Sequence, residues 1–373
     1  MIVAHSSEIE IKKSLILREK RLDLLGSENK MLYVVSLYKD PTGGPETLHQ
    51  FARQIKNHGG EVAMVYCDED TVDVPDKFKI YEIPVVRIKD VVDTKENMII
   101  VPEAKTAFLY QFKNIRKCIW WLSKNFYYGF NSLEGLIRCA ERQKIKKIMY
   151  PVCIPLMYLK HRLTRGYFKF GKDKNEIFHM YNCEYVRLYL EEKGVKKENT
   201  MYMCGPIREE YFESSWRKRE PLVTYNPKKN LEFTKKILKE LNSKYPEIKT
   251  VAIKGMKPDE IVDLLSSCSV YMDFGHFPGP ERIPREAVTC GCNIITSRYG
   301  SAANKVDVLV PERFKIDAKK SNIKTIVENI KELVDNYPLY VHEYDAYREK
   351  VANQKELFVT NSEKFLKEVL MKG

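Results

Sequence analysis

Short apolar runs alternate with amphipathic stretches along most of the chain. Residues 31–38 (MLYVVSLY) form a continuous β-rich run of the kind that is buried on both faces of a parallel sheet. A glycine-containing break at 39–45 is followed by a helical pattern that ends at Gly59-Gly60, and residues 61–66 are again strand-like. A strand, a glycine loop, a helix and a second strand in this order predict one βαβ unit.

The alternation continues along the chain in two series. In the first, strands are predicted at 98–103, 116–123, 176–183 and 201–205, with helices at 105–114 and 184–195. In the second, a strand and turn are predicted at 222–229 and strands at 250–255, 269–275, 292–296 and 305–311, with helices at 231–244, 257–268, 283–291 and 323–337. Two consecutive series predict an α/β protein with two doubly wound, Rossmann-like sheets.

Domain boundaries follow from this organisation. The polar stretch at 214–221 ends in proline and is the predicted interdomain linker. We expect four parts: a helical extension at 1–30, Rossmann-like domains at 31–215 and 216–340, and C-terminal helices at 341–373. Ligands of such sheets bind beyond the carboxyl ends of the strands, so the site is expected in a cleft that the two domains face.

The formal net charge of +12 predicts attraction to an anionic partner such as nucleic acid, anionic lipid or nucleotide phosphates. Nine cysteines are scattered without zinc-like spacing, which favours free thiols in a reducing cytosol. The N-terminus lacks the pattern of a secretory signal, and the longest apolar run, 148–159, is too short to span a bilayer. These features predict a cytoplasmic protein that is soluble or lies on a membrane surface.

A candidate ribose-binding carboxylate lies in the first turn of the helix predicted at 283–291. Glu286 follows Arg282 by four residues, and a carboxylate there can accept hydrogen bonds from two vicinal hydroxyls. The alternative is that Glu286 only caps its helix and pairs with Arg282 or Arg285.

Phosphate-binding groups are predicted around the same helix. Gly300-Ser301-Ala302 offers successive backbone amides, a common way to hold phosphate. Lys228 and Lys229 follow the first strand of the second series, and Lys254 ends the next strand. Together these residue types predict contacts with a ribose, a diphosphate and a base.

Residues 255–304 (GMKPDEIVDLLSSCSVYMDFGHFPGPERIPREAVTCGCNIITSRYGSAAN) resemble the donor-binding region of GT-B glycosyltransferases. The likeness is greatest to the family 4 (group 1) enzymes of bacterial capsule and O-antigen polysaccharide synthesis. The resemblance implies that Glu286, with Arg282 beside it, binds the donor ribose, and that Met256 lies by the base. The implied phosphate contacts are Gly300, Ser301, Ala302 and Lys229, with Lys228 beside it.

The resemblance extends to the front of the chain and covers about 31–335. Residues 42–65 (TGGPETLHQFARQIKNHGGEVAMV) are similar to the start of these enzymes, which implies that Gly43 and Gly44 approach the donor phosphate. One position departs from the family pattern. The family has a second glutamate with seven residues between it and the first; here that position is Pro278, and Glu281 lies three residues further on.

Two residues are candidates for acid/base chemistry. Glu103 follows a strand of the first series and is expected to face the donor, where it could deprotonate an acceptor hydroxyl or only cap the next helix. His276 lies near Asp273 at a strand end, where a satisfied loop pair is the alternative.

A basic segment at 141–176 has ten Lys/Arg against three acids, a difference of +7, with aromatic residues interleaved. This mixture favours an anionic membrane surface, whereas single-stranded nucleic acid or a solvated face would also account for it.

We therefore expect a metal-independent, retaining glycosyltransferase of hexosyltransferase type, placed peripherally on the inner face of the cell membrane. Its second domain would bind a nucleotide-sugar, most simply a UDP- or GDP-sugar, and its first domain a glycan or lipid-linked acceptor. No cofactor besides the donor and no nucleic acid is expected. The alternatives are a nucleotide-sugar epimerase of the same fold, or a basic nucleic-acid-binding protein.

Overall fold

The computed structural model describes residues 30–39, 43–127, 133–143, 145–164, 168–214 and 216–372. The chain forms two compact units. The first consists of residues up to Val101 with 108–118 and 362–373, and the second of 102–107 and 119–361. The predicted helical extension at 1–30 lies outside the described residues, except for Lys30.

The first sheet has six strands in the order β2-β1-β3-β4-β5-β6, with parallel pairing of β1 with β2 and β3 and of β5 with β6. Leu32, Val34 and Val35 of β1 are fully buried, as the continuous apolar run predicts. The strands are β1 Met31–Ser36, β2 Glu61–Tyr66, β3 Met98–Pro102, β4 Arg116–Trp121, β5 Phe178–Tyr181 and β6 Thr200–Tyr202.

In the first unit, helix α2 (Gly43–Asn57) buries Leu48, Phe51 and Ile55. The end of the chain also belongs to this unit. The ring of Phe365 packs edge-on against Phe51, with the ring centroids 5.4 Å apart.

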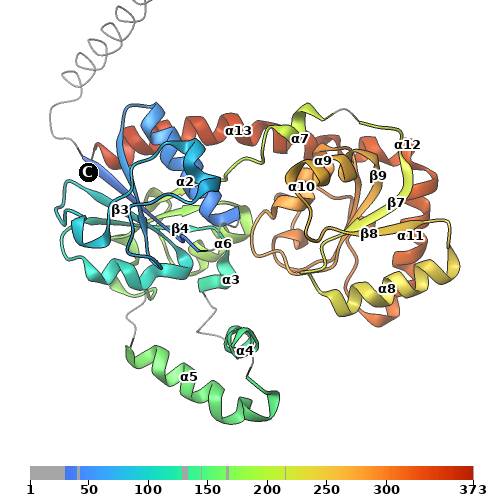
Figure 1. Ribbon diagram of the computed structural model, residues 1–373, viewed down its shortest axis with the longest axis horizontal. Helices are drawn as coiled ribbons and strands as arrows, with labels where there is room; N and C mark the ends of the chain where they lie inside the picture. Colours follow the sequence, from blue (N-terminus) through green and yellow to red (C-terminus); the bar gives the residue numbers. More distant parts are fainter. Residues whose placement is uncertain are drawn as a thin grey trace, which may run out of the picture. The chain divides into compact units, whose positions relative to one another are not determined.

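The second sheet lies in the second unit and has four parallel strands in the order β10-β9-β7-β8. Helices α8 and α11 cover one face, and α9 and α10 cover the other (Figure 1). The elements are β7 Glu220–Tyr225, α8 Leu231–Lys244, β8 Lys249–Ala252, α9 Pro258–Ser267, β9 Cys268–Asp273, α10 Arg282–Thr289, β10 Asn293–Thr296 and α11 Ile323–Asp335.

The remaining helices differ in length and in their agreement with the sequence pattern. Residues 105–114 were expected to be helical, and Glu103–Gln111 forms 3-10 turns instead of an α-helix. The other helices are α3 Lys124–Tyr127, α4 Leu133–Arg142, α5 Tyr150–Thr164, α6 Glu184–Glu192, α7 Glu210–Glu213, α12 Tyr337–Tyr340 and α13 Asp345–Phe365. Among the described residues, no helix has the length and apolar character needed to cross a bilayer.

The predicted strand at 305–311 is wrong. Residues 305–307 form a turn, because the side-chain oxygen of Asn304 accepts hydrogen bonds from the amides of Val306 (2.8 Å) and Asp307 (2.7 Å). The chain instead returns to the sheet at Lys315, which forms a parallel bridge with Thr296 at the end of β10.

Candidate functional site

The candidate site is built at one edge of the second sheet. Thr296 at the end of β10 pairs with Asp273 at the end of β9, and Tyr225 at the end of β7 pairs with Met272. The loops that follow these three strands therefore start from the same edge, where parallel sheets bind ligands. They contribute Lys229 after β7, His276 after β9 and Gly300 after β10.

Lys229 lies at the centre of this group. Its Nζ is 2.8 Å from Oε2 of Glu281 and donates a hydrogen bond of 2.9 Å to the carbonyl of His276. Both members of the ion pair are mostly buried, with side-chain exposures of 20% and 21%. The structure thus holds a cation and a carboxylate together where the sequence predicts the diphosphate site.

The buried carboxyl group of Asp273 lies near the charge of Lys229. Burial raises the pKa of Asp273 to about 6, and the nearby charge of Lys229 and the amide of Gly275 oppose the rise. Asp273 accepts hydrogen bonds from the Gly275 amide (2.9 Å) and the Tyr271 hydroxyl (3.0 Å). Gly275 lets Lys229 approach, since a Cβ there would lie 2.7 Å from the Lys229 Cβ.

Glu281 is a site residue to which the sequence analysis gave no role. It precedes α10 with φ 35°, a left-handed conformation that is uncommon outside glycine. Its carbonyl accepts a 2.9 Å hydrogen bond from Nε of Arg285 while its carboxylate pairs with Lys229. Its position in sequence does not match the family pattern, and only the path of the loop between β9 and α10 reveals the pairing.

The loop after β10 packs tightly against the loop after β9. Gly300 has φ 66°, and a Cβ there would lie 2.0 Å from the Phe277 carbonyl oxygen and 2.9 Å from Cε1 of His276. The Ser301 amide donates to the Phe277 carbonyl (2.8 Å), and the Ser301 hydroxyl donates to the Gly279 carbonyl (2.6 Å). Ser301 and Ala302 are fully buried, so both of these Ser301 donors already have partners within the protein.

Glu286 is buried in α10, 6% exposed, with Oε1 3.4 Å from Nε of Arg282. This pairing matches the interaction that the four-residue spacing suggests. Burial raises the pKa of the Tyr211 hydroxyl, and the charge of Glu286 adds to the rise.

Other predicted donor residues lie apart from the Lys229 group. Lys228 and Lys254 are exposed and Met256 is half-buried; in the described part of the chain no hydrogen bond or ion pair joins them to Lys229. Gly43 and Gly44 are the first residues of α2, in the other compact unit.

Glu103 is 3% exposed and accepts a 2.9 Å hydrogen bond from the Leu122 amide. Burial raises its pKa to about 8, whereas hydrogen bonds from the amides of Leu122, Ser123 and Glu103 itself lower it. The Leu122 carbonyl in turn accepts from Nδ2 of Asn182 (2.7 Å). Glu103 therefore holds the end of β4 in place.

His276 is exposed and contacts residues of the helices α3 and α6. Its Nδ1 lies 3.0 Å from Nδ2 of Asn125 on α3, and its ring meets the edge of Tyr185, with centroids 6.4 Å apart. His276 could be predicted from its place after a strand, whereas Asn125 and Tyr185 lie 151 and 91 residues earlier in the chain and could not.

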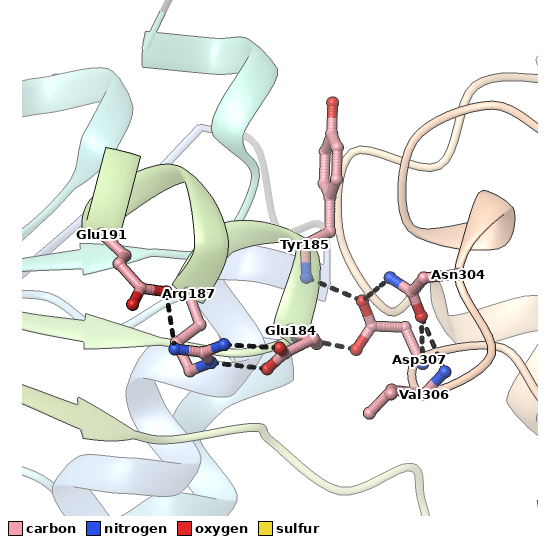
Figure 2. Close-up of polar contacts among 7 residues, drawn as sticks. All are labelled: Glu184, Tyr185, Arg187, Glu191, Asn304, Val306 and Asp307. Carbon is pink, nitrogen blue, oxygen red and sulfur yellow. Dashed lines mark hydrogen bonds and ion pairs between the residues drawn. The ribbon is translucent and has the colours of Figure 1, made fainter. Parts of the chain in front are cut away.

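A carboxylate from the loop after β10 also reaches α6, as Figure 2 shows. Asp307 accepts hydrogen bonds from the amides of Glu184 (2.7 Å) and Tyr185 (2.8 Å), the first residues of the helix. The Asn304 side chain donates to the same carboxylate at 2.7 Å. Asp307 thus occupies the N-terminus of α6, where a helix favours negative charge.

Asp68-Glu69-Asp70 has the spacing of an Asp-x-Asp pair, the type of sequence that can hold a divalent cation. Asp68 accepts hydrogen bonds from the amides of Tyr38 (2.7 Å) and Lys39 (3.1 Å), and Glu69 pairs with Lys39. Among the described residues, no group of three or more His, Cys, Asp or Glu is arranged to hold a metal ion.

No protein-family model matches the sequence, and no curated protein matches it. Three solved structures show the fold. Sucrose-phosphate synthase from Thermosynechococcus elongatus has a TM-score of 0.59 at 12% identity, and the match covers 92% of this chain and 100% of that one. WaaG, a glycosyltransferase involved in lipopolysaccharide biosynthesis, has a TM-score of 0.54 at 10% identity, with 90% of this chain and 98% of that one covered. The pneumococcal O-GlcNAc transferase GtfA in complex with UDP and GlcNAc has a TM-score of 0.56 at 8% identity, with 93% of this chain and 99% of that one covered.

At these identities the likeness is one of fold. The two parallel sheets with these structural neighbours confirm the predicted α/β fold class, the GT-B fold of glycosyltransferases.

Proposed function

We propose that this chain transfers a sugar from a nucleotide-sugar, a UDP- or GDP-sugar, to a glycan or lipid-linked acceptor. The observation that carries the proposal is the Lys229 group. A mostly buried lysine lies at the carboxyl edge of the second sheet, beside the Gly300 loop, in a chain whose structural neighbours include glycosyltransferases. Within this proposal the enzyme is a retaining hexosyltransferase of bacterial surface polysaccharide synthesis, as the sequence resemblance implies.

Lys229 would act on the leaving group. A donor diphosphate beside Lys229 would replace the Glu281 carboxylate as the partner of the ammonium. The cation then lies where negative charge develops as the sugar departs, which is the kind of stabilisation that accelerates transfer most. Glu286, held by Arg282, would accept hydrogen bonds from the ribose hydroxyls.

A thermal-shift screen with UDP, GDP, CMP and ADP tests the donor site. A nucleoside diphosphate at about 100 times its Kd should raise the apparent stability by about 2.7 kcal/mol. Lys229→Met and Glu286→Ala should reduce the shift to a small fraction of the wild-type value. Lys235→Met is the matched control, because Lys235 is an exposed lysine of α8 that pairs with Glu232. A screen in which no nucleotide shifts the wild-type protein would contradict the proposal.

We further propose that the protein lies peripherally on the inner face of the cell membrane through α5. Val152, Leu156 and Leu159 are 57%, 59% and 50% exposed, and their spacing of four and three places them on one side of the helix. Exposed Lys146 and Lys147 precede the helix. An apolar stripe beside cations is the combination that binds an anionic membrane surface.

Vesicle sedimentation tests this placement. Wild-type protein should sediment with phosphatidylglycerol vesicles and much less with phosphatidylcholine vesicles. Leu156→Glu combined with Leu159→Glu should abolish sedimentation, whereas Leu339→Glu, at a 68% exposed leucine of α12, should leave it unchanged. Equal sedimentation of both variants would remove α5 from the proposal, and binding to single-stranded DNA instead of vesicles would favour the nucleic-acid alternative.

A further inference from the structure

A lysine directly after β4 has aromatic neighbours in place of an acidic one. Lys124 begins α3, and its Nζ lies 3.9 Å from the ring centroid of Tyr185 and 4.8 Å from that of Tyr189. Tyrosine faces hold an ammonium by cation–π attraction and leave its charge uncompensated.

Lys193 provides an internal comparison, because it lies over the same Tyr189 ring at 5.3 Å. Its ammonium is 3.0 Å from Oε1 of Glu192, so that charge is compensated. Within the described residues, no carboxylate lies within ion-pair distance of Lys124. Of these two lysines, Lys124 alone can offer its full charge to a ligand.

The helix end next to Lys124 is already occupied. Asp307 accepts the amides of Glu184 and Tyr185, and the Tyr185 side chain points away from that carboxylate (Figure 2). An anion approaching Tyr185 therefore finds the first amides of α6 in use. The positive group that faces it is the ammonium of Lys124.

Lys124 is also linked to the candidate donor site by its neighbour in sequence. Asn125 Nδ2 lies 3.0 Å from Nδ1 of His276, and the His276 carbonyl accepts the hydrogen bond from Lys229. The His276 ring meets Tyr185 edge-on. The residues from Lys124 to Lys229 thus form one continuous series of contacts at the edges of both sheets.

We propose that Lys124 and Tyr185 form an anion subsite that binds a phosphate group of the acceptor. Lysine binds phosphate as a compact point charge, as the lysine of phosphate-binding loops does. The inference rests on the proposed function: the sugar is taken to leave the donor beside Lys229 and His276, so the acceptor must bind next to them, where Lys124 lies.

Lysine methylation followed by NMR measures the subsite directly. Dimethylation with ¹³C keeps the charge, and the signal of Lys124 is identified by its loss in Lys124→Arg. Methyl phosphate and dihexanoyl phosphatidylglycerol are titrated separately, with and without saturating UDP. The Lys124 signal should shift and saturate while that of Lys193 stays in place. Tyr185→Leu should weaken the response at least about tenfold, which is 1.4 kcal/mol.

The outcomes separate the possible answers. A response to methyl phosphate identifies a soluble phosphate group as sufficient, and a response to the lipid alone identifies a phospholipid headgroup; both support the subsite. Equal movement of the Lys124 and Lys193 signals, or movement of neither, overturns it. UDP binding is read from the thermal shift, so loss of the donor proposal and loss of the subsite are distinguishable.

Discussion

Lys229 follows β7 of the second sheet and Lys124 follows β4 of the first, and the two lysines differ in how their charge is balanced. Lys229 pairs with Glu281 at 2.8 Å, whereas Lys124 lies on the faces of Tyr185 and Tyr189. A lysine with a resident carboxylate must exchange it when a ligand anion binds. A lysine on aromatic faces can bind an anion without losing a partner. Within the two proposals above, this difference would give the two lysines different tasks.

A buried carboxyl group accompanies each lysine, and the pKa values of the two groups also differ. Asp273 lies near Lys229, and Glu103 accepts hydrogen bonds from the amides of Leu122 and Ser123, just before Lys124 in the chain. Burial raises the pKa of Asp273 to about 6 although Lys229 lies nearby, and raises that of Glu103, which only backbone amides oppose, to about 8. A neighbouring cation favours the ionised form, so the carboxyl behind Lys229 ionises at lower pH. Glu103 is mostly protonated at neutral pH and supports the end of β4 as a neutral group.

The largest expected effect is on the pH dependence of stability at Glu103. Its pKa is higher in the folded chain than in the unfolded chain, so its contribution is complete below about pH 4.5 and is lost as pH rises through about 8. Glu103→Gln keeps an acceptor for the Leu122 amide and cannot ionise. Between pH 5 and pH 8 the wild type should lose about 3–5 kcal/mol relative to this variant.

Urea unfolding at a series of pH values measures this loss. Asp273→Asn is the matched comparison, and its difference from wild type should develop between about pH 4 and pH 6. Parallel pH profiles for wild type and Glu103→Gln would show that Glu103 is not buried as a neutral group.

The next effect is at Gly300, on the Lys229 side. An alanine there would combine a left-handed backbone with a Cβ 2.0 Å from the Phe277 carbonyl oxygen, so Gly300→Ala should lower the free energy of unfolding by about 2–4 kcal/mol. Gly255→Ala is the control: φ is 69° but nothing lies within 4 Å of a Cβ, and about 1 kcal/mol is expected. Equal losses, measured by urea denaturation, would mean that the Gly300 contact is not made.

If a bound diphosphate replaces Glu281 as the partner of Lys229, changes at Lys229 and at Glu281 should have opposite effects on UDP affinity. Lys229→Met removes hydrogen bonds to a charged ligand, worth about 1.5–3 kcal/mol each, so UDP affinity should fall about a hundredfold. Glu281→Gln removes the competing carboxylate and should raise UDP affinity about threefold to tenfold. Calorimetric titration measures both. Weaker UDP binding by Glu281→Gln would mean that Glu281 supports the ligand instead of competing with it.

The smallest effect is expected at the α6 end next to Lys124. Asp307→Asn keeps an acceptor for only one of the Glu184 and Tyr185 amides, which contact different carboxylate oxygens, and it loses the charge, so stability should fall by about 1–2 kcal/mol. Asp259→Asn, at an exposed aspartate in the first turn of α9, should cost only a few tenths. Thermal unfolding at low and high salt separates the charge effect from the loss of packing.

The sequence predicts the sheet elements well because a buried parallel strand needs a continuous apolar run whatever surrounds it. β1, β2, β7 and β10 lie where such runs occur. Residues 305–311 also contain an apolar run, at 308–310, but the side chain of Asn304 determines a turn just before it that periodicity does not reveal. The hydrophobic pattern indicates which residues are buried, but it does not indicate which side chain accepts a hydrogen bond from a given backbone amide.

The candidate site was less accessible to sequence reasoning. Lys229, His276 and Gly300 were identified because each directly follows a strand, and strand ends at one edge of a sheet lie near one another. Glu281 and Lys124 were missed, since their importance depends on a loop path and on rings from a distant helix. Residue type and spacing do not reveal such pairings, which arise only when separate segments fold together.

The pairing of Lys229 with Glu281 also has a consequence for which ligands the resting protein admits. The carboxylate is attached to the same chain, so it competes with a ligand at the high effective concentration of an intramolecular partner. A neutral sugar carries no negative charge to pair with the Lys229 ammonium, and a monoanion would only replace the single negative charge of Glu281 with another. Within the proposed function, a diphosphate would bring enough negative charge to displace Glu281, so the ion pair would favour ligands of high negative charge.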